Sequence, residues 1–168
     1  MSLPDVIGPD LKVLFCGINP GLLAAASGHH FAGRGNRFWR VMHLSGFTSQ
    51  QIAPHDSRTL LHHGCGLTTM VERATAREDQ IDPAEYAAAA GGFQCKIAQY
   101  RPAFVAFLGK PAFAGLTNRT TVAWGPQSMM IAGAKAWVLP NPSGRNRSFD
   151  LTRLVEVYQE LRLAAFPA

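Results

Sequence analysis

The sequence predicts an α/β fold with a mainly parallel central sheet. Short apolar segments alternate with amphipathic helical segments along the 168 residues, which is the pattern of repeated βαβ units. Several apolar segments have no polar face, as expected for strands that helices cover on both sides. Because no repeat, low-complexity segment or linker interrupts this alternation, we expect a single domain spanning residues 1–168.

The predicted strands are short and bounded by turn residues. The first is Lys12–Cys16, an apolar run that ends in a glycine-rich turn, and the second lies within residues 103–109 ("AFVAFLG"). Two more, Ser128–Ile131 and Ala136–Leu139, flank a tight glycine-containing turn and predict a hairpin. Residues 66–71 ("GLTTMV") match neither a helix nor a strand pattern clearly.

The predicted helices begin at recognisable caps. Asp82, Pro83 and Glu85 combine an N-cap, a proline in the first turn and a glutamate three residues after the cap. This helix is expected to run to about Tyr100. The other expected helices are Asn36–Gly46, Asp56–Gly64, a short one from Pro111, and an amphipathic C-terminal helix over residues 151–161.

Composition restricts the possible functions only loosely. The net charge of +5 is compatible with a polyanionic partner, and arginines gather in two loop-like stretches, residues 33–40 ("GRGNRFWR") and 143–147 ("SGRNR"). Three widely spaced cysteines indicate reduced thiols in a cytoplasmic protein and argue against a disulfide frame or an iron–sulfur site. We expect no signal peptide and no membrane span.

Three polar loops follow predicted strands and should meet at one edge of the sheet. They are residues 17–21 ("GINPG"), 109–112 ("GKPA") and 140–147 ("PNPSGRNR"). Ligands of open α/β sheets bind beyond the carboxyl ends of the strands. Two of the loops contain Asn-Pro, at Asn19 and Asn141, so we expect two amide side chains to face one crevice.

Several common kinds of site are disfavoured by the residues present. The glycine-rich loops lack the lysine and hydroxyl of a nucleoside-triphosphate loop and the spacing of a dinucleotide fingerprint. The adjacent histidine pairs, 29–30 and 62–63, lack zinc-ligand spacing, although the first pair precedes Phe31 in a loop that could line the crevice. No nucleophile elbow and no pair of strand-end carboxylates is present.

Each remaining candidate residue also has a purely structural interpretation. Asn19 and Asn141 can each stabilise a local turn, since Asn-Pro is a common turn pair. Phe31 and Trp39 can be core residues, and the core is the interpretation we favour for Trp39. Two Asn-Pro loops, an aromatic glycine-rich loop and a basic loop together favour a binding site over simple turns.

These motifs resemble a known family. The order and spacing of "GINPG", "NRFW" (residues 36–39) and "LPNPSG" (139–144) resemble those of the mismatch-specific uracil-DNA glycosylases, bacterial relatives of thymine-DNA glycosylase. The similarity runs from about Leu11 through the last helix. It implies a three-layer α/β/α fold and the excision of uracil, or of a related pyrimidine such as ethenocytosine or thymine opposite guanine, from duplex DNA.

The resemblance also implies roles for individual residues. Asn19 is expected to position the attacking water, while the backbone near Ile18 and the side chain of Asn141 stabilise the negative charge on the departing base. The ring of Phe31 is expected to stack on the flipped base. The DNA-binding loop is expected to contact phosphate, the unpaired guanine and the gap in the duplex through Ser143, Gly144, Arg145, Asn146 and Arg147.

Two positions depart from the bacterial pattern. Arg145 replaces an apolar leucine in the loop that enters the duplex, as in thymine-DNA glycosylase relatives, and its alternative role is that of a surface arginine adding electrostatic affinity. Thr69 replaces a lysine near the base pocket, which affects the expected range of substrates.

The sequence-based hypothesis is therefore a monomeric, monofunctional glycosylase that needs neither metal nor cofactor and leaves an abasic site. Its partner is duplex DNA containing G·U or a similar mismatch. The alternatives are a non-catalytic DNA-binding module on the same fold and a small-molecule nucleotide-binding protein.

Overall fold

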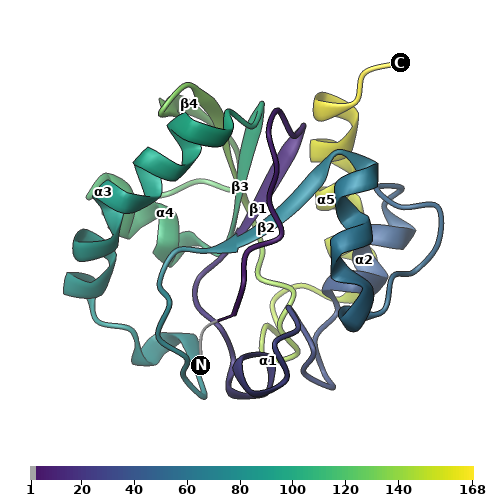
Figure 1. The fold of residues 1–168 in the computed structure, drawn as a ribbon, viewed down its shortest axis with the longest axis horizontal. Coiled ribbons are helices and arrows are strands. Elements are labelled where there is room, and N and C mark those ends of the chain that lie inside the picture. Colours follow the sequence, from purple (N-terminus) through teal and green to yellow (C-terminus); the bar gives the residue numbers. More distant parts are fainter. Residues whose placement is uncertain (1–2) are drawn as a thin grey trace.

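A parallel sheet with one antiparallel edge strand forms the centre of the computed structural model, which describes residues 3–168 (Figure 1). The strand order is β2-β1-β3-β5-β4, and β4 alone runs antiparallel among the strands described. The strands are β1 (Val13–Gly17), β2 (Cys65–Thr69), β3 (Phe104–Leu108), β4 (Gly125–Ile131) and β5 (Ala134–Leu139). Met1 and Ser2, part of the stretch in which we expect no signal peptide, lie outside the described residues.

Helices cover both faces of this sheet. Figure 1 shows α3 and α4 on one side of the strands and α2 and α5 on the other. The helical segments are α1 (Leu22–Ser27), α2 (Phe38–Leu44), the 3₁₀ segments η1 (Pro54–His63) and η2 (Glu78–Gln80), α3 (Pro83–Tyr100), α4 (Lys110–Thr117) and α5 (Leu151–Ala165). The predicted α/β class with a mainly parallel central sheet is confirmed.

Side chains of each central strand alternate between two cores. In β1, Val13 and Phe15 pack among the residues of α2 and α5, whereas Leu14 and Cys16 pack among those of α3 and α4. All residues of this strand are buried. Burial on both faces explains why the sequence shows a continuous apolar run there instead of an alternating pattern.

One predicted cap is confirmed and two helix starts differ. Asp82 and Glu85 form the expected capping box at the start of α3. The helix expected over Asn36–Gly46 is α2, whose N-cap is Arg37; Asn36 precedes this cap and accepts a hydrogen bond from the backbone N–H of Phe38 at 2.9 Å. The segment expected to start at Asp56 instead begins at Pro54 and is a 3₁₀ segment. It ends, as predicted, at Gly64, whose φ of +73° suits glycine.

Three elements were not predicted from the sequence: β2, α1 and the short 3₁₀ segment η2. Residues 65–69 form β2, which is held by parallel pairing with β1 and by a bridge between Leu67 and Val6. The short helix α1 directly follows the "GINPG" turn. Among residues 3–168, no helix combines the length and the apolar character needed to span a membrane.

Candidate functional site

The loops that follow β1, β2, β3 and β5 leave the same edge of the sheet, because these strands are parallel. Close packing at glycines brings the predicted site residues together there. A Cβ added at Gly109 would lie 3.2 Å from the side chain of Ile18 and 3.7 Å from Cβ of Asn141. One added at Gly17 would lie within 4.0 Å of both Thr69 and Phe31.

The amide of Asn19 is anchored by its nitrogen. Nδ2 donates to the carbonyl of Arg73 and to the hydroxyl oxygen of Thr75, both at 2.8 Å, and to the carbonyl of Pro20 at 3.2 Å. The Thr75 hydroxyl donates its own proton to the carbonyl of Arg77 at 2.6 Å. Thr75 therefore acts as an acceptor toward Asn19, and every neighbour of this nitrogen is an acceptor.

This arrangement fixes which end of the amide is free. A carbonyl oxygen in the place of Nδ2 would face three acceptors and no donor. Oδ1 of Asn19 consequently points away from these anchors, and no donor among the described residues bonds to it. Asn19 is half-buried, and this oxygen is an acceptor whose orientation is fixed by the anchored nitrogen.

The loop that anchors Asn19 is itself tied to α3. The guanidinium of Arg73 contacts both carboxylate oxygens of Glu85, at 2.7 and 2.9 Å, and donates to the carbonyl of Gln80 at 2.9 Å. Glu85 also accepts from the backbone N–H of Asp82. The bond to Arg73 and then the bond to Asp82 lower the pKa of Glu85 to about 2, so the carboxylate stays charged at neutral pH.

Asn141 uses both ends of its amide within the protein. Its Oδ1 accepts from the backbone N–H of Ser143 at 2.9 Å, and its Nδ2 donates to the carboxylate of Glu78. Partial loss of water around the Glu78 carboxylate, and then the charge of Asp79, raise the pKa of Glu78. The Asn141 nitrogen carries two N–H groups, and the one not bonded to Glu78 has no acceptor among the described residues.

The ring of Phe31 is partly committed to the core. It is half-buried and stacks on Phe38 with centroids 4.1 Å apart and planes 21° apart. Its φ of +56° is unusual for a non-glycine residue. Trp39 is buried, and its indole N–H donates to the carbonyl of His30, as expected for a core residue.

The loop of residues 143–147 is exposed at its tip and organised at its base. Ser143 Oγ accepts from the backbone N–H of Arg145 at 3.2 Å, and the Asn146 side chain donates to the carbonyl of Asn141 at 3.0 Å. The residues with exposed side chains or backbone are Gly144, Arg145 and Arg147. The two arginine side chains therefore face solvent.

Histidines and cysteines offer little chemistry at this edge. His30 is buried, its Nε2–H donates to the carbonyl of Pro4 at 2.7 Å, and burial lowers its pKa. The His30 ring is therefore a core group. Cys16 and Cys65 are buried free thiols, and burial raises the pKa of Cys65 to about 12. Neither thiol is a ready nucleophile.

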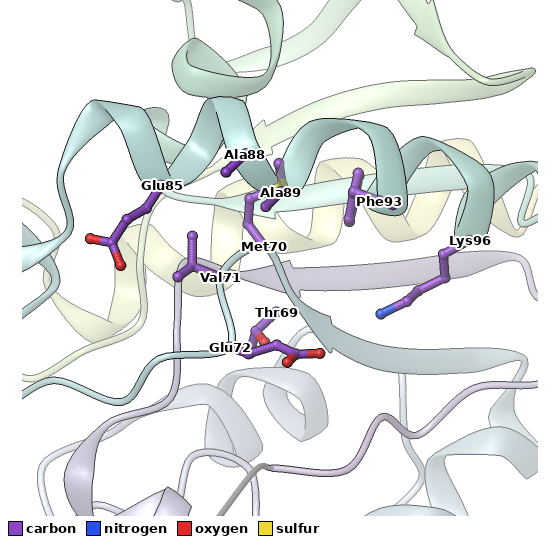
Figure 2. Close-up of a pocket in the computed structure, with 10 residues that line it drawn as sticks. Thr69, Met70, Val71, Glu72, Glu85, Ala88, Ala89, Phe93 and Lys96 are labelled. Atoms are coloured by element: carbon purple, nitrogen blue, oxygen red, sulfur yellow. The ribbon is translucent and has the colours of Figure 1, made fainter.

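Two hollows flank the loops. One of about 520 Å³ lies between the end of β2 and α3, where Figure 2 shows the Lys96 side chain extending from α3 in the same hollow as Thr69. The Lys96 ammonium donates to the carboxylate of Asp5 and to the hydroxyl oxygen of Thr68. The second hollow, of about 640 Å³, is lined by Phe31 and by arginines. Neither is lined by Asn19 or Asn141, so we place the candidate site by its contacts instead of by its volume.

Four residues that organise the site have no role in the sequence-based hypothesis: Arg37, Arg73, Thr75 and Glu78. Their partners are more than fifty residues away in several cases, as in the 56-residue separation of Asn19 and Thr75. Of the four, only Arg37 lies in a stretch that the sequence singles out, the arginine-rich "GRGNRFWR".

The comparisons with known proteins identify a family and a fold. The family model described as Uracil DNA glycosylase superfamily matches residues 4–162. The chain also resembles the solution NMR structure of a candidate uracil DNA glycosylase from Methanosarcina acetivorans. The TM-score is 0.65 and the identity 23%, over 96% of this chain and 97% of that one, a likeness that shows the fold. The extent of the family match leads to the conclusion that the chain belongs to the uracil DNA glycosylase superfamily.

Proposed function

We propose that this protein is a monofunctional, mismatch-specific glycosylase that hydrolyses the N-glycosidic bond of uracil opposite guanine. Ethenocytosine and thymine opposite guanine are further substrates under this proposal, and the product is an abasic site. The observation that carries the proposal is the orientation of Asn19, whose nitrogen is held by Arg73 and Thr75 while its oxygen remains free.

The proposed chemistry depends on positioning. Cleavage of the bond between base and sugar places positive charge on deoxyribose and negative charge on the departing base. An amide is too weak a base to deprotonate water, but an oriented carbonyl oxygen holds a water in line with C1′. Because Asn19 is already anchored before DNA binds, little reorganisation is needed when the substrate arrives.

The departing base needs hydrogen-bond donors. In the proposed complex the backbone near Ile18 and the second N–H of the Asn141 amide supply them, while Glu78 keeps the first N–H. A single donor aimed at developing negative charge is worth roughly 10²–10³ in rate. Because the Asn141 nitrogen already donates to a carboxylate, its second N–H is a weaker donor, and Glu78 therefore reduces the stabilisation of the departing base.

Access to the base requires that it leave the duplex. We assign the stacking surface to Phe31, whose other face rests on Phe38, and the neighbouring wall to Thr69. Ser143, Gly144 and Asn146 contact the backbone and the unpaired guanine, while Arg145 fills the gap and Arg147 adds phosphate affinity. The exposure of both arginines supports this assignment.

The test uses end-labelled duplexes that carry one U·G, ethenocytosine·G or T·G pair, with a C·G duplex as the unmodified control. Alkali after incubation should give strand breaks at the modified position, and omission of alkali should leave the strand intact because the enzyme is monofunctional. The Asn19→Ala variant, purified identically, controls for contaminating glycosylases. Absence of breaks with both U·G and ethenocytosine·G would refute the proposal. DNA binding without cleavage would favour a binding module, and saturable nucleotide binding without DNA affinity would favour a nucleotide-binding protein.

A further inference from the structure

One arginine gathers the backbone of the loop that follows β5. The guanidinium of Arg37 donates to the carbonyl of Phe149 at 2.7 Å, of Ser143 at 2.9 Å, of Asn146 at 3.0 Å and of Pro142 at 3.3 Å. Its own backbone N–H donates to the carbonyl of Pro142 at 3.0 Å. The bonded carbonyls span residues 142–149, the whole segment that carries the proposed DNA contacts.

The form of this contact is specific to arginine. A guanidinium offers five N–H donors in a rigid plane, whereas an ammonium concentrates three donors at one point. All four partners of the Arg37 side chain are backbone carbonyls, and no ion pair of Arg37 with a carboxylate occurs in residues 3–168. The cation therefore fixes the path of the loop and leaves positive charge beneath its exposed tip.

The same short segment reaches the proposed base-stacking ring. Phe38, the next residue, begins α2 and stacks on Phe31 with ring centroids 4.1 Å apart. On the other side of Arg37, the carbonyl of Gly35 lies so close to Gly144 that a Cβ added there would be 2.7 Å from it. Residues 35–38 thus connect the loop at 142–149 with Phe31.

We propose that Arg37 is a positioning residue that holds the 142–149 loop in the conformation needed to enter the duplex, without itself contacting the reacting atoms. This inference rests on the proposed function. It implies that Arg37 supports the opening of a base pair more than the chemistry on a base that is already unpaired. A loop that loses the Arg37 guanidinium keeps the bond from the Tyr158 hydroxyl to the carbonyl of Pro140 and the bond from the backbone N–H of residue 37 to Pro142. It loses the four side-chain bonds that join residue 37 to the carbonyls at 142–149.

The experiment compares Arg37→Ala and Arg37→Lys with Arg40→Ala, a control that removes the same charge from an exposed position one turn along α2. Single-turnover excision is measured on uracil in a U·G duplex and on uracil in single-stranded DNA. We expect Arg37→Ala to slow excision from the duplex by roughly 10- to 100-fold, because small displacements of a positioning group cause rate losses of this size. The effect on the single strand should be much smaller. Arg37→Lys should show the same selectivity with a partial loss, and added guanidinium should restore part of the Arg37→Ala rate.

Three results would overturn the inference: equal losses on the two substrates, a loss matched by Arg40→Ala, or full activity of Arg37→Lys. Hydrogen exchange of the free proteins provides a readout independent of catalysis. Arg37→Ala should accelerate exchange of amides within residues 142–149 relative to α3, even if the wild type excises no uracil. Faster exchange in Arg37→Ala, together with a wild type that excises no uracil, would contradict the proposed function but support the role of Arg37 in holding the loop. Unchanged exchange would contradict the role of Arg37. Arg37→Lys serves in the same assay if Arg37→Ala does not fold.

Discussion

Asn19 and Asn141 begin the same dipeptide at the same edge of the sheet, but their amides are used differently. Asn19 gives its nitrogen to the carbonyl of Arg73 and the hydroxyl of Thr75 and keeps its oxygen free. Asn141 accepts through its oxygen from the backbone of Ser143 and donates one N–H to Glu78. Asn19 is therefore ready to hold a water, whereas Asn141 can offer a base only its second N–H, which the bond to the Glu78 carboxylate weakens. The comparison shows that the partners of an amide, more than the Asn-Pro motif, determine its role.

After Asn19→Ala, the largest effect around this pair is expected for Asn141→Ala. Loss of its donor removes stabilisation of the departing base and should lower the single-turnover rate on U·G by about 100-fold. The rate should fall less than in Asn19→Ala, because the backbone near Ile18 still supplies donors. A larger loss in Asn141→Ala than in Asn19→Ala would reverse the roles assigned to the two loops.

Thr75→Val tests the anchoring of the Asn19 amide. Valine keeps the shape of threonine but removes the acceptor that orients the Asn19 nitrogen. An unpaired donor of this kind costs about 1–3 kcal/mol, so we expect kcat to fall on the order of tenfold with little change in KM. Thr75→Ser retains the hydroxyl and should retain most of the activity. Equal kinetics for the valine and serine variants would show that the hydroxyl does not orient Asn19.

Glu78→Gln tests whether the Glu78 carboxylate weakens Asn141 as a hydrogen-bond donor. Because the pKa of Glu78 is raised, wild-type excision should increase as the pH falls through that pKa and the charge that holds Asn141 is lost. Glutamine removes this charge at all pH values, so the variant should be about threefold faster near neutral pH and lack that acidic increase. The effect should vanish in the Asn141→Ala background. Persistence of the gain there would mean that Glu78 acts elsewhere.

The smallest effect concerns the support of the Asn19 loop. The folded-state pKa of Glu85 is about 2, below its ordinary value of 4.5, so its ion pair with Arg73 stabilises the protein fully above pH 4.5. That contribution is lost as the pH falls toward 2. Since the pair is exposed, Glu85→Gln should lower the melting temperature at pH 7 by only about 1–3 °C. The difference from wild type should disappear at low pH, and a pH-independent difference would indicate another cause.

Local sequence patterns were sufficient to predict the elements that are buried on both faces or begin with a strong helix cap. The run at β1 and the Asp82–Glu85 box specify their elements through neighbouring residues alone. In contrast, β2 contains Gly66, Thr68 and Thr69, and its strand conformation is stabilised by pairing with β1. Propensity could not reveal that pairing.

The same distinction applies to the candidate site. The Asn-Pro loops were visible in the sequence because each is a short local motif. The partners that orient them were not, because Asn141 meets Glu78 across 63 residues and Arg37 meets Phe149 across 112. Such contacts join irregular loops that have no periodicity, so only the folded sheet edge brings them together.

The central claim is that Asn19 positions the attacking water, and its most direct test is the single-turnover rate of Asn19→Ala on a U·G duplex. The affinity for a duplex carrying a non-cleavable uracil analogue is measured in parallel. We expect the rate to fall on the order of 10³-fold with the affinity nearly unchanged, because a water-positioning group contributes to the reaction and not to ground-state binding. A rate close to that of the wild type, or a loss that is entirely explained by weaker DNA binding, would contradict the account.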